Sequence, residues 1–194
     1  MLKIKIGVVF GAVIAGVLMS AKLNAGPSDP VMPAREGGPN LVSNPGFEEG
    51  QKGWNAVVQS GKYDLTIDRT QAHKGKASAK IACIEPGLCM WRQGIPVEKG
   101  KKYYFSLWVK NESNDNGTPM IWLQQGNSPV KGEVLFLNEG QEGEVEGNWE
   151  KYAIREFTAL EDHLTIILQS HDLYADDDKG AVWFDDIVLR KIGD

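Results

Sequence analysis

Three short segments of the chain combine an aromatic or imidazole ring with an amide side chain two residues away. The pairs are Trp91 with Gln93, Trp122 with Gln124, and Gln169 with His171. Residues two apart share one face of a β-strand, so each pair would present a flat ring beside a planar hydrogen-bonding group. A ligand with apolar C–H faces and hydroxyl groups, such as a sugar, needs that combination.

The same tryptophans have a second interpretation, because a Trp in a sandwich strand packs into the core more often than it binds a ligand. We assign Trp54, Trp149 and Trp183 to the core or its rim. Trp91 and Trp122 stay open between the two interpretations. The third pair can equally be the end of an edge strand.

Carboxylates stand beside apolar residues in two widely separated motifs, Asn40–Glu48 and Val182–Leu189. Glu48 belongs to the first motif, and Asp185 and Asp186 belong to the second. Two carboxyl groups about 5 to 9.5 Å apart can hydrolyse a glycosidic bond. Alternatively, the carboxylates surround a cation, or they are solvated and pair with lysines.

Evidence for catalysis is otherwise missing from the sequence. Glu133, Glu146 and Asp172 have no recognisable pairing, and the chain has three histidines but no Gly-x-Ser-x-Gly motif. No phosphate-binding loop is present either. We therefore expect a protein that is not an enzyme.

The elements that must position these residues are short strands. From Asn40 onward, runs rich in Val, Ile, Thr, Tyr, Phe and Trp alternate with Gly, Asn, Asp and Pro clusters, and no long segment has helical periodicity. This pattern predicts an all-β sandwich or barrel. The expected strands are 41–43, 53–58, 63–68, 76–84, 88–97, 102–111, 120–125, 132–137, 149–158, 164–171 and 181–191.

The expected strand 102–111 shows the alternation most clearly. One face carries Tyr103, Phe105, Leu107 and Val109, which we expect in the core. The other face carries Tyr104, Ser106, Trp108 and Lys110. The period alone does not decide which face is which, but Tyr104 and Trp108 are further candidates for a ligand surface.

The two cysteines, Cys83 and Cys89, are separated by Ile-Glu-Pro-Gly-Leu. In an exported chain this spacing suggests a disulfide across a small turn between paired strands 76–84 and 88–97. A metal or redox pair is the alternative, but no other Cys and no Cys-x-x-Cys spacing supports it.

The N-terminus resembles a targeting segment. Lys3 and Lys5 precede an apolar run from Ile6 to Met19, and Leu23-Asn-Ala25 offers a cleavage site. We expect a signal peptide at 1–25, a flexible Pro- and Gly-rich lead-in at 26–39 and one domain at 40–194. The protein would then be secreted, periplasmic or at the cell surface, without membrane insertion after cleavage.

Charge narrows the choice of partners. The formal net charge is −5, and loss of Lys3, Lys5 and Lys22 with the signal peptide would make it −8. This acidity argues against nucleic acid and against an anionic membrane surface.

The order of motifs resembles the carbohydrate-binding modules of the CBM4/9/22 type, which share the galactose-binding-like jelly roll. The resemblance extends from Asn40 to about Lys191. Its pieces are Asn40–Glu48, Gly53-Trp54, His73–Ser78, Gln93–Val97, Gly100–Lys110, Trp149, Phe157-Thr158 and Val182–Leu189.

This resemblance implies a structural calcium ion. In the family, the first strand supplies a Glu and a nearby carbonyl, which correspond here to Glu48 and Gly46. A carbonyl comes from the turn His73–Lys76, represented by Lys76, and an Asp of the last strand is Asp186 or Asp185. Calcium takes six to eight oxygen ligands of these types.

The resemblance also implies a function. We expect an exported, non-catalytic carbohydrate-binding module that binds a polysaccharide or oligosaccharide by aromatic stacking and amide hydrogen bonds. The alternative is a structural or adhesive jelly roll that contacts other proteins at the cell surface or in a matrix. A small polysaccharide-active enzyme is the third hypothesis.

Overall fold

The computed structural model describes residues 37–112, 119–126, 134–137, 145–170 and 180–193. The described residues all belong to one compact unit. Its described parts consist of strands and loops, without a helix, as the alternating sequence pattern predicts. The strands are β1 (Asn55–Asp68), β2 (Ser78–Pro96), β3 (Lys102–Asn111), β4 (Pro119–Gln125), β5 (Val134–Leu137), β6 (Val145–Glu146), β7 (Trp149–Thr158), β8 (His163–Ser170) and β9 (Ala181–Lys191).

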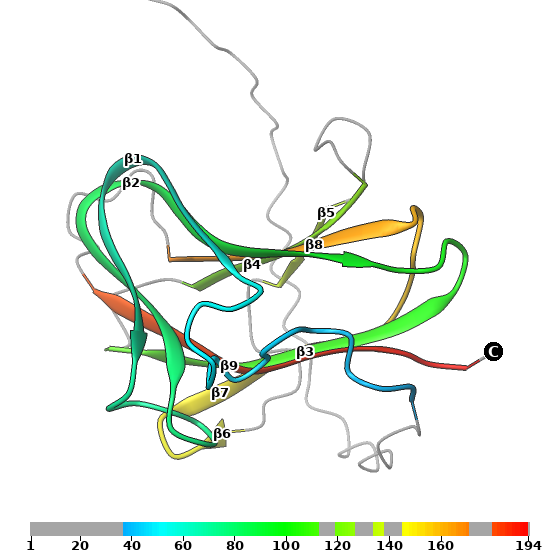
Figure 1. Cartoon of the computed structure of the whole chain (residues 1–194), viewed down its shortest axis with the longest axis horizontal. Helices are drawn as coiled ribbons and strands as arrows, with labels where there is room; N and C mark the ends of the chain where they lie inside the picture. Colours follow the sequence, from blue (N-terminus) through cyan, green and yellow to red (C-terminus); the bar gives the residue numbers. More distant parts are fainter. Residues whose placement is uncertain (1–36, 113–118, 127–133, 138–144, 171–179, 194) are drawn as a thin grey trace, which may run out of the picture. The chain divides into compact units, whose positions relative to one another are not determined.

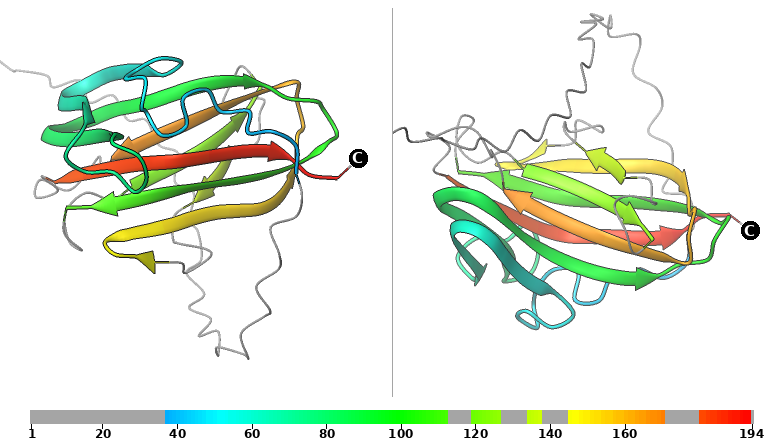
Figure 2. Two further views of the ribbon diagram at one scale, coloured as in Figure 1. Left: turned by 60° about the horizontal axis from the view of Figure 1, so that its bottom comes forward. Right: turned by 90° about the horizontal axis from the view of Figure 1, so that it is seen from above.

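The strands form two antiparallel layers that share the long strand β2. The hydrogen-bonded order is β5-β4-β8-β2-β9-β3-β7-β6, and β1 pairs with β2 along its length. Residues Trp91–Pro96 of β2 pair with β8, whereas Ala79–Ala82 pair with β9. β1 and β2 therefore curve together from one layer to the other (Figure 1). Two further views show the layers, with β4, β5 and β8 in one and β9, β3 and β7 in the other (Figure 2). The predicted jelly-roll β-sandwich is confirmed.

The core lies between the two layers and follows the period of two along each strand. On β3, the predicted inward residues Tyr103, Phe105, Leu107 and Val109 are all buried. β4 and β8 add Ile121, Leu123, Leu164, Ile166 and Leu168, and β9 adds Val182, Phe184, Ile187 and Leu189. Trp149 and Trp183 belong to a separate small cluster on the other side of β9, which agrees with their assignment to the core or its rim.

The cysteine turn that we expected is absent from the described structure. β2 continues as one strand from Ser78 to Pro96, and β1 likewise spans two of the predicted strands. Register shifts between Val58 and Tyr63 let both strands bend without leaving their ladder. Gly61 and Pro86 lie close together at this bend.

The predicted disulfide is wrong for the same reason. No disulfide joins Cys83 and Cys89, which lie on one continuous strand, opposite Tyr63 and Val58 of β1 respectively. Cys89 is buried, and burial raises the pKa of its thiol to about 12. Such a thiol stays protonated at neutral pH and is a poor nucleophile.

Smaller differences concern the ends of the domain. Residues 41–43 form a bend whose Leu41 N donates to Leu189 O, and not a regular strand. β6 lies between the expected strands 132–137 and 149–158, where the sequence predicted no strand. In the described ranges, no helix is long and apolar enough to cross a membrane.

Candidate functional site

Trp91 and Gln93, the first predicted pair, are in the interior. Trp91 is 1% exposed and its Nε1 donates to Lys80 O at 3.3 Å. Gln93 is 4% exposed; its Oε1 accepts from Ser43 N at 2.7 Å and its Nε2 donates to Ser43 O at 3.0 Å. Their assignment to a ligand surface is therefore wrong. The period of two placed them correctly on one face, but that face is the core.

Trp122 and Gln124, the second pair, lie on the outward face of β4. Their neighbours Ile121 and Leu123 are fully buried in the core, whereas Trp122 and Gln124 are each half-buried. The predicted sharing of a face by these two residues is confirmed. The Trp122 side chain therefore lies outside the core and is partly exposed.

The strand register shows what surrounds Trp122. Trp122 pairs with Ile167 of β8, which in turn pairs with Arg92 of β2. In the next row, Gln124 pairs with Thr165. Paired residues of neighbouring strands point to the same side of a sheet. We call the outward side chains of Arg92, Trp122, Gln124, Thr165, Ile167 and Gln169 the Trp122 face.

The dimensions of the Trp122 face suit an elongated polar ligand. Neighbouring strands are about 4.8 Å apart, so Trp122 and Arg92 are separated by about 10 Å across β8. Ile167, which is 7% exposed, forms an apolar floor between them. A ring, an apolar floor, a guanidinium and an amide are thus brought together over three strands.

Gln169, from the third pair, lies on the same face one row further along β8. Its side chain is 1% exposed, and its Nε2 donates to Cys89 O at 3.3 Å. Its Oε1 has no hydrogen-bond partner in the described part of the chain. A buried acceptor of this kind needs a partner such as water or a ligand hydroxyl. His171 lies outside the described residues.

Arg92 is a residue of this face that the sequence reasoning missed. Arg92 stands between Trp91 and Gln93 in the sequence. Because we predicted that these two residues face the ligand, we expected Arg92 on the other face of the strand. Its exposed side chain alternates with the buried Trp91, Gln93 and Ile95. The apolar residues Trp91 and Ile95, on either side of Gln93, could have indicated that this alternate set of residues points into the core.

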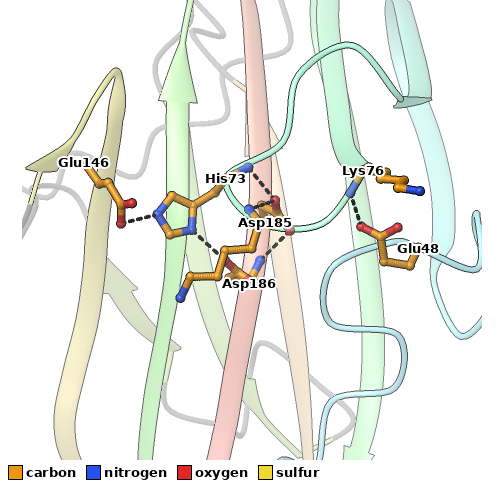
Figure 3. Close-up of polar contacts among 7 residues, drawn as sticks. Glu48, His73, Lys76, Glu146, Asp185 and Asp186 are labelled. Carbon is orange, nitrogen blue, oxygen red and sulfur yellow. Dashed lines mark hydrogen bonds and ion pairs between the residues drawn. The ribbon is translucent and has the colours of Figure 1, made fainter.

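Four predicted metal ligands, Glu48, Lys76, Asp185 and Asp186, lie at or beside the turn 73–76 (Figure 3). Asp185 and Asp186 belong to β9, in the layer opposite the Trp122 face. Asp185 is fully buried there; its Oδ2 accepts from His73 N at 2.7 Å and Lys74 N at 3.2 Å. Its Oδ1 accepts from Asp186 N at 2.7 Å. Burial raises the pKa of Asp185 to about 7, although these backbone hydrogen bonds oppose the rise. Asp185 thus fixes the turn to β9.

Glu48 holds the other side of the same turn. Its Oε1 accepts from Lys76 N at 2.6 Å and from Ala77 N at 3.1 Å. Gly75 makes this approach possible, because a Cβ there would lie 2.1 Å from Glu48 Oε1 and its φ is +72°. The first motif is therefore anchored to the turn through a carboxylate that contacts backbone N–H groups.

His73 belongs to a lysine-rich turn, but its side chain is only 1% exposed. Its ring stacks on Trp108 with 4.0 Å between centroids and 16° between planes. Nδ1 lies 2.5 Å from Asp186 Oδ2, and Nε2 lies 3.1 Å from Glu146 Oε2. The imidazole fills the space between β3, β6 and β9, which explains its burial in a lysine-rich turn.

Candidate ligands for a calcium ion surround one pocket beside the turn 73–76. Glu48 and Asp186 line a pocket of about 350 Å³ together with Gly46 and Gly75. Asp186, with a φ of +48°, is the aspartate that reaches this pocket, whereas Asp185 is buried behind it. Carboxylates and carbonyls are donors that calcium prefers. Within the described ranges no three His, Cys, Asp or Glu side chains form a group that could hold a metal ion, so backbone oxygens would have to supply most of the ligands of a calcium ion here.

Known proteins support a carbohydrate-binding assignment. The sequence matches the family described as "Carbohydrate binding domain" over residues 39–169, more than half of the chain. Endo-1,4-beta-xylanase A of Thermotoga neapolitana is 28% identical over 165 residues, which are 77% of this chain. The chain spans only 15% of that curated relative.

Solved structures share the fold. TmCBM61 in complex with β-1,4-galactotriose superimposes with a TM-score of 0.56 at 16% identity, covering 79% of this chain and 99% of that chain. The CBM22-1 xylan-binding domain of Xyn10C from Paenibacillus barcinonensis has a TM-score of 0.54 at 19% identity, with 77% and 92% covered. These matches are to binding modules, which are non-catalytic domains. The chain belongs to the carbohydrate-binding domain family.

Proposed function

We propose that this protein is exported and binds a polysaccharide or oligosaccharide on the Trp122 face. The observation that carries the proposal is the half-buried Trp122 ring, which shares its side of the sheet with Gln124 and Arg92. An aromatic ring can stack on the C–H face of a sugar, while amide and guanidinium groups donate to its hydroxyls.

The relatives indicate which ligands to examine first. The structures of TmCBM61 and the Xyn10C module are named for a β-1,4-galactotriose complex and for xylan binding, respectively. We therefore place β-linked oligosaccharides first among the ligands of this chain. The buried Gln169 Oε1 is a further acceptor on the same face for a hydroxyl or a bridging water.

The test is isothermal titration calorimetry with a panel of β-linked oligosaccharides. We expect Trp122→Ala to weaken binding by about tenfold or more, because lost stacking costs on the order of 1 kcal/mol beyond the buried area. Trp108→Ala is the matched control, since Trp108 is equally half-buried but belongs to the other layer. Equal losses in both variants, or no binding by the unchanged protein, would contradict the proposal and favour the adhesive alternative.

We further propose a structural calcium ion in the pocket lined by Glu48 and Asp186, with backbone oxygens of Gly46 and of the turn 74–76. The ion would link the first motif to the turn and to β9. Its role would be to stabilise the domain, because the pocket and the Trp122 face belong to different layers.

Export is the last part of the proposal and rests on the N-terminal targeting pattern. Mass spectrometry of the protein from the culture medium or periplasm should find a chain that begins at Gly26. Recovery of the uncleaved chain in the cytoplasm alone would refute export.

A further inference from the structure

The Trp122 face carries an arginine that no described residue of the chain neutralises. Arg92 is exposed, and no hydrogen bond or ion pair joins it to another residue of the described chain. Its paired neighbours are Asn55 of β1 and Ile167 of β8, neither of which is charged. By contrast, exposed lysines elsewhere contact glutamates, as in the pairs Lys52–Glu49, Lys99–Glu161 and Lys102–Glu156.

His163 lies near the Arg92 end of the same face. His163 begins β8 opposite Pro96, but its ring lies over Gly94, since a Cβ on Gly94 would meet His163 Nε2 at 2.8 Å and Cε1 at 2.9 Å. Gly94 is two residues from Arg92, a step of about 7 Å along the strand. A side chain at position 94 would collide with the ring where it lies, so Gly94 leaves room for a second nitrogen-bearing group at the Arg92 end of the face.

The charge of the face opposes the charge of the chain. The outward residues of β4 and β8 and the Met90–Pro96 part of β2 include no carboxylate within the described ranges. Glu161, in the turn before β8, is paired with Lys99. The chain as a whole has a formal net charge of −5. A local cationic site attracts an anionic ligand even on an acidic protein, and here no described carboxylate on the face would repel that ligand.

The chemistry of these groups distinguishes between classes of sugar. A guanidinium offers parallel N–H donors that match the two oxygens of a carboxylate, and such charge-assisted pairs are stronger than bonds to neutral hydroxyls. Trp122 can stack on any pyranose and Gln124 can hydrogen-bond to it, whereas Arg92 can form a charged pair only with an acidic sugar. Neutral glycans would leave the guanidinium solvated and unused.

We propose that the Trp122 face selects glycans that contain uronic acids, with Arg92 binding the sugar carboxylate and His163 donating to it or to an adjacent hydroxyl. The inference rests on the proposed function, because it names the ligand class of the same face. The carboxylate would lie at the β2 side of the face, while the ring of the same or the next sugar stacks on Trp122.

The experiment compares an acidic oligosaccharide with its own neutral form. Oligogalacturonate, oligomannuronate and glucuronoxylan oligosaccharides are titrated by calorimetry beside the same samples after reduction of the carboxyl groups to alcohols. We expect at least one acidic form to bind about tenfold tighter than its reduced form at low salt, with the difference shrinking as NaCl is added.

Variants assign the effect to Arg92. Arg92→Gln should lower the affinity for the acidic form to near that of the reduced form, and should leave the affinity for the reduced form unchanged. Arg69→Gln is the control, because Arg69 is also exposed but lies beyond the far end of β1. It removes the same charge and should have little effect.

The outcomes separate this inference from the proposed function. If acidic and reduced forms bind equally, or Arg69→Gln weakens binding as much as Arg92→Gln, the preference for uronic acids is refuted while glycan binding stands. If the protein binds neither form and no neutral glycan, both are refuted.

Discussion

Substitution of Gly75 tests how the motif Asn40–Glu48 is attached to the domain, because Glu48 contacts the turn at this glycine. Gly75→Ala introduces a Cβ that would lie 2.1 Å from Glu48 Oε1, on a residue with a φ of +72°. The conformation alone costs about 1 kcal/mol for a non-glycine residue. Displacing Glu48 also breaks its hydrogen bonds to Lys76 N and Ala77 N, which for an exposed carboxylate adds about 1 to 2 kcal/mol.

Gly100→Ala is the matched control for this substitution. Gly100 has a φ of +79°, but nothing lies within 4 Å of an added Cβ. We therefore expect about 1 kcal/mol for Gly100→Ala and about 2 to 3 kcal/mol for Gly75→Ala. For a domain of this size the second value corresponds to a fall in Tm of about 5 to 10 °C.

The assay is urea unfolding followed by tryptophan fluorescence, with each glycine variant also made in a Glu48→Ala background. If the excess cost comes from Glu48, Gly75→Ala and Gly100→Ala should cost about the same once Glu48 is removed. A Gly75→Ala variant that is no less stable than Gly100→Ala would refute the reasoning, and so would an excess that survives without Glu48.

Three other predictions concern titration, thiol reactivity and metal binding. Burial acts to raise the pKa of Asp68, but hydrogen bonds from Thr70 and Trp183 and the charge of Lys80 outweigh it and lower the pKa to about 2. Because the folded pKa is below the unfolded one, the stability from Asp68 is present above about pH 4 and is lost as the pH falls toward 2. After allowance for solvent screening, urea unfolding should show about 1 kcal/mol of acid-dependent loss that Asp68→Asn lacks; an unchanged pH profile in that variant would count against the assignment. Cys89 should react slowly with a thiol reagent in the native protein and rapidly in urea, and rapid native labelling at Cys89 would show that it is not buried as described. Calcium should raise the Tm of the chelator-treated protein but not that of Glu48→Gln, whereas an equal rise in both would exclude Glu48 as a ligand.

The sequence predicted the fold because its signals are repeated over the whole chain. The alternation of Tyr103, Phe105, Leu107 and Val109 reports a buried face of β3 directly. The register of Trp122 with Ile167 and Arg92 is set by pairing between distant strands, and no local pattern reveals it.

The site was predicted only in part, because a period of two does not state which face is inside. Trp122 and Gln124 lie on the outward face as a pair, whereas Trp91 and Gln93 lie in the core. The choice depends on which side the sandwich closes, and that is a property of the whole sheet.

The prediction of a turn between Cys83 and Cys89 was wrong for a related reason. Pro86 and Gly87 normally end a strand, but β1 follows β2 through the bend and keeps the ladder paired through register shifts. His73 shows the same dependence on tertiary structure, because the stacking partner that buries it, Trp108, is far away in sequence.

The central claim, that the Trp122 face binds a glycan, is tested most directly by NMR. The six tryptophans each give an indole N–H signal, and Trp122→Phe and Trp108→Phe identify two of them. Titration with a bound oligosaccharide should shift the Trp122 signal progressively and leave the Trp108 signal in place. A titration that moves Trp108 or Trp183 and leaves Trp122 unchanged would place the ligand on the opposite layer and contradict the account.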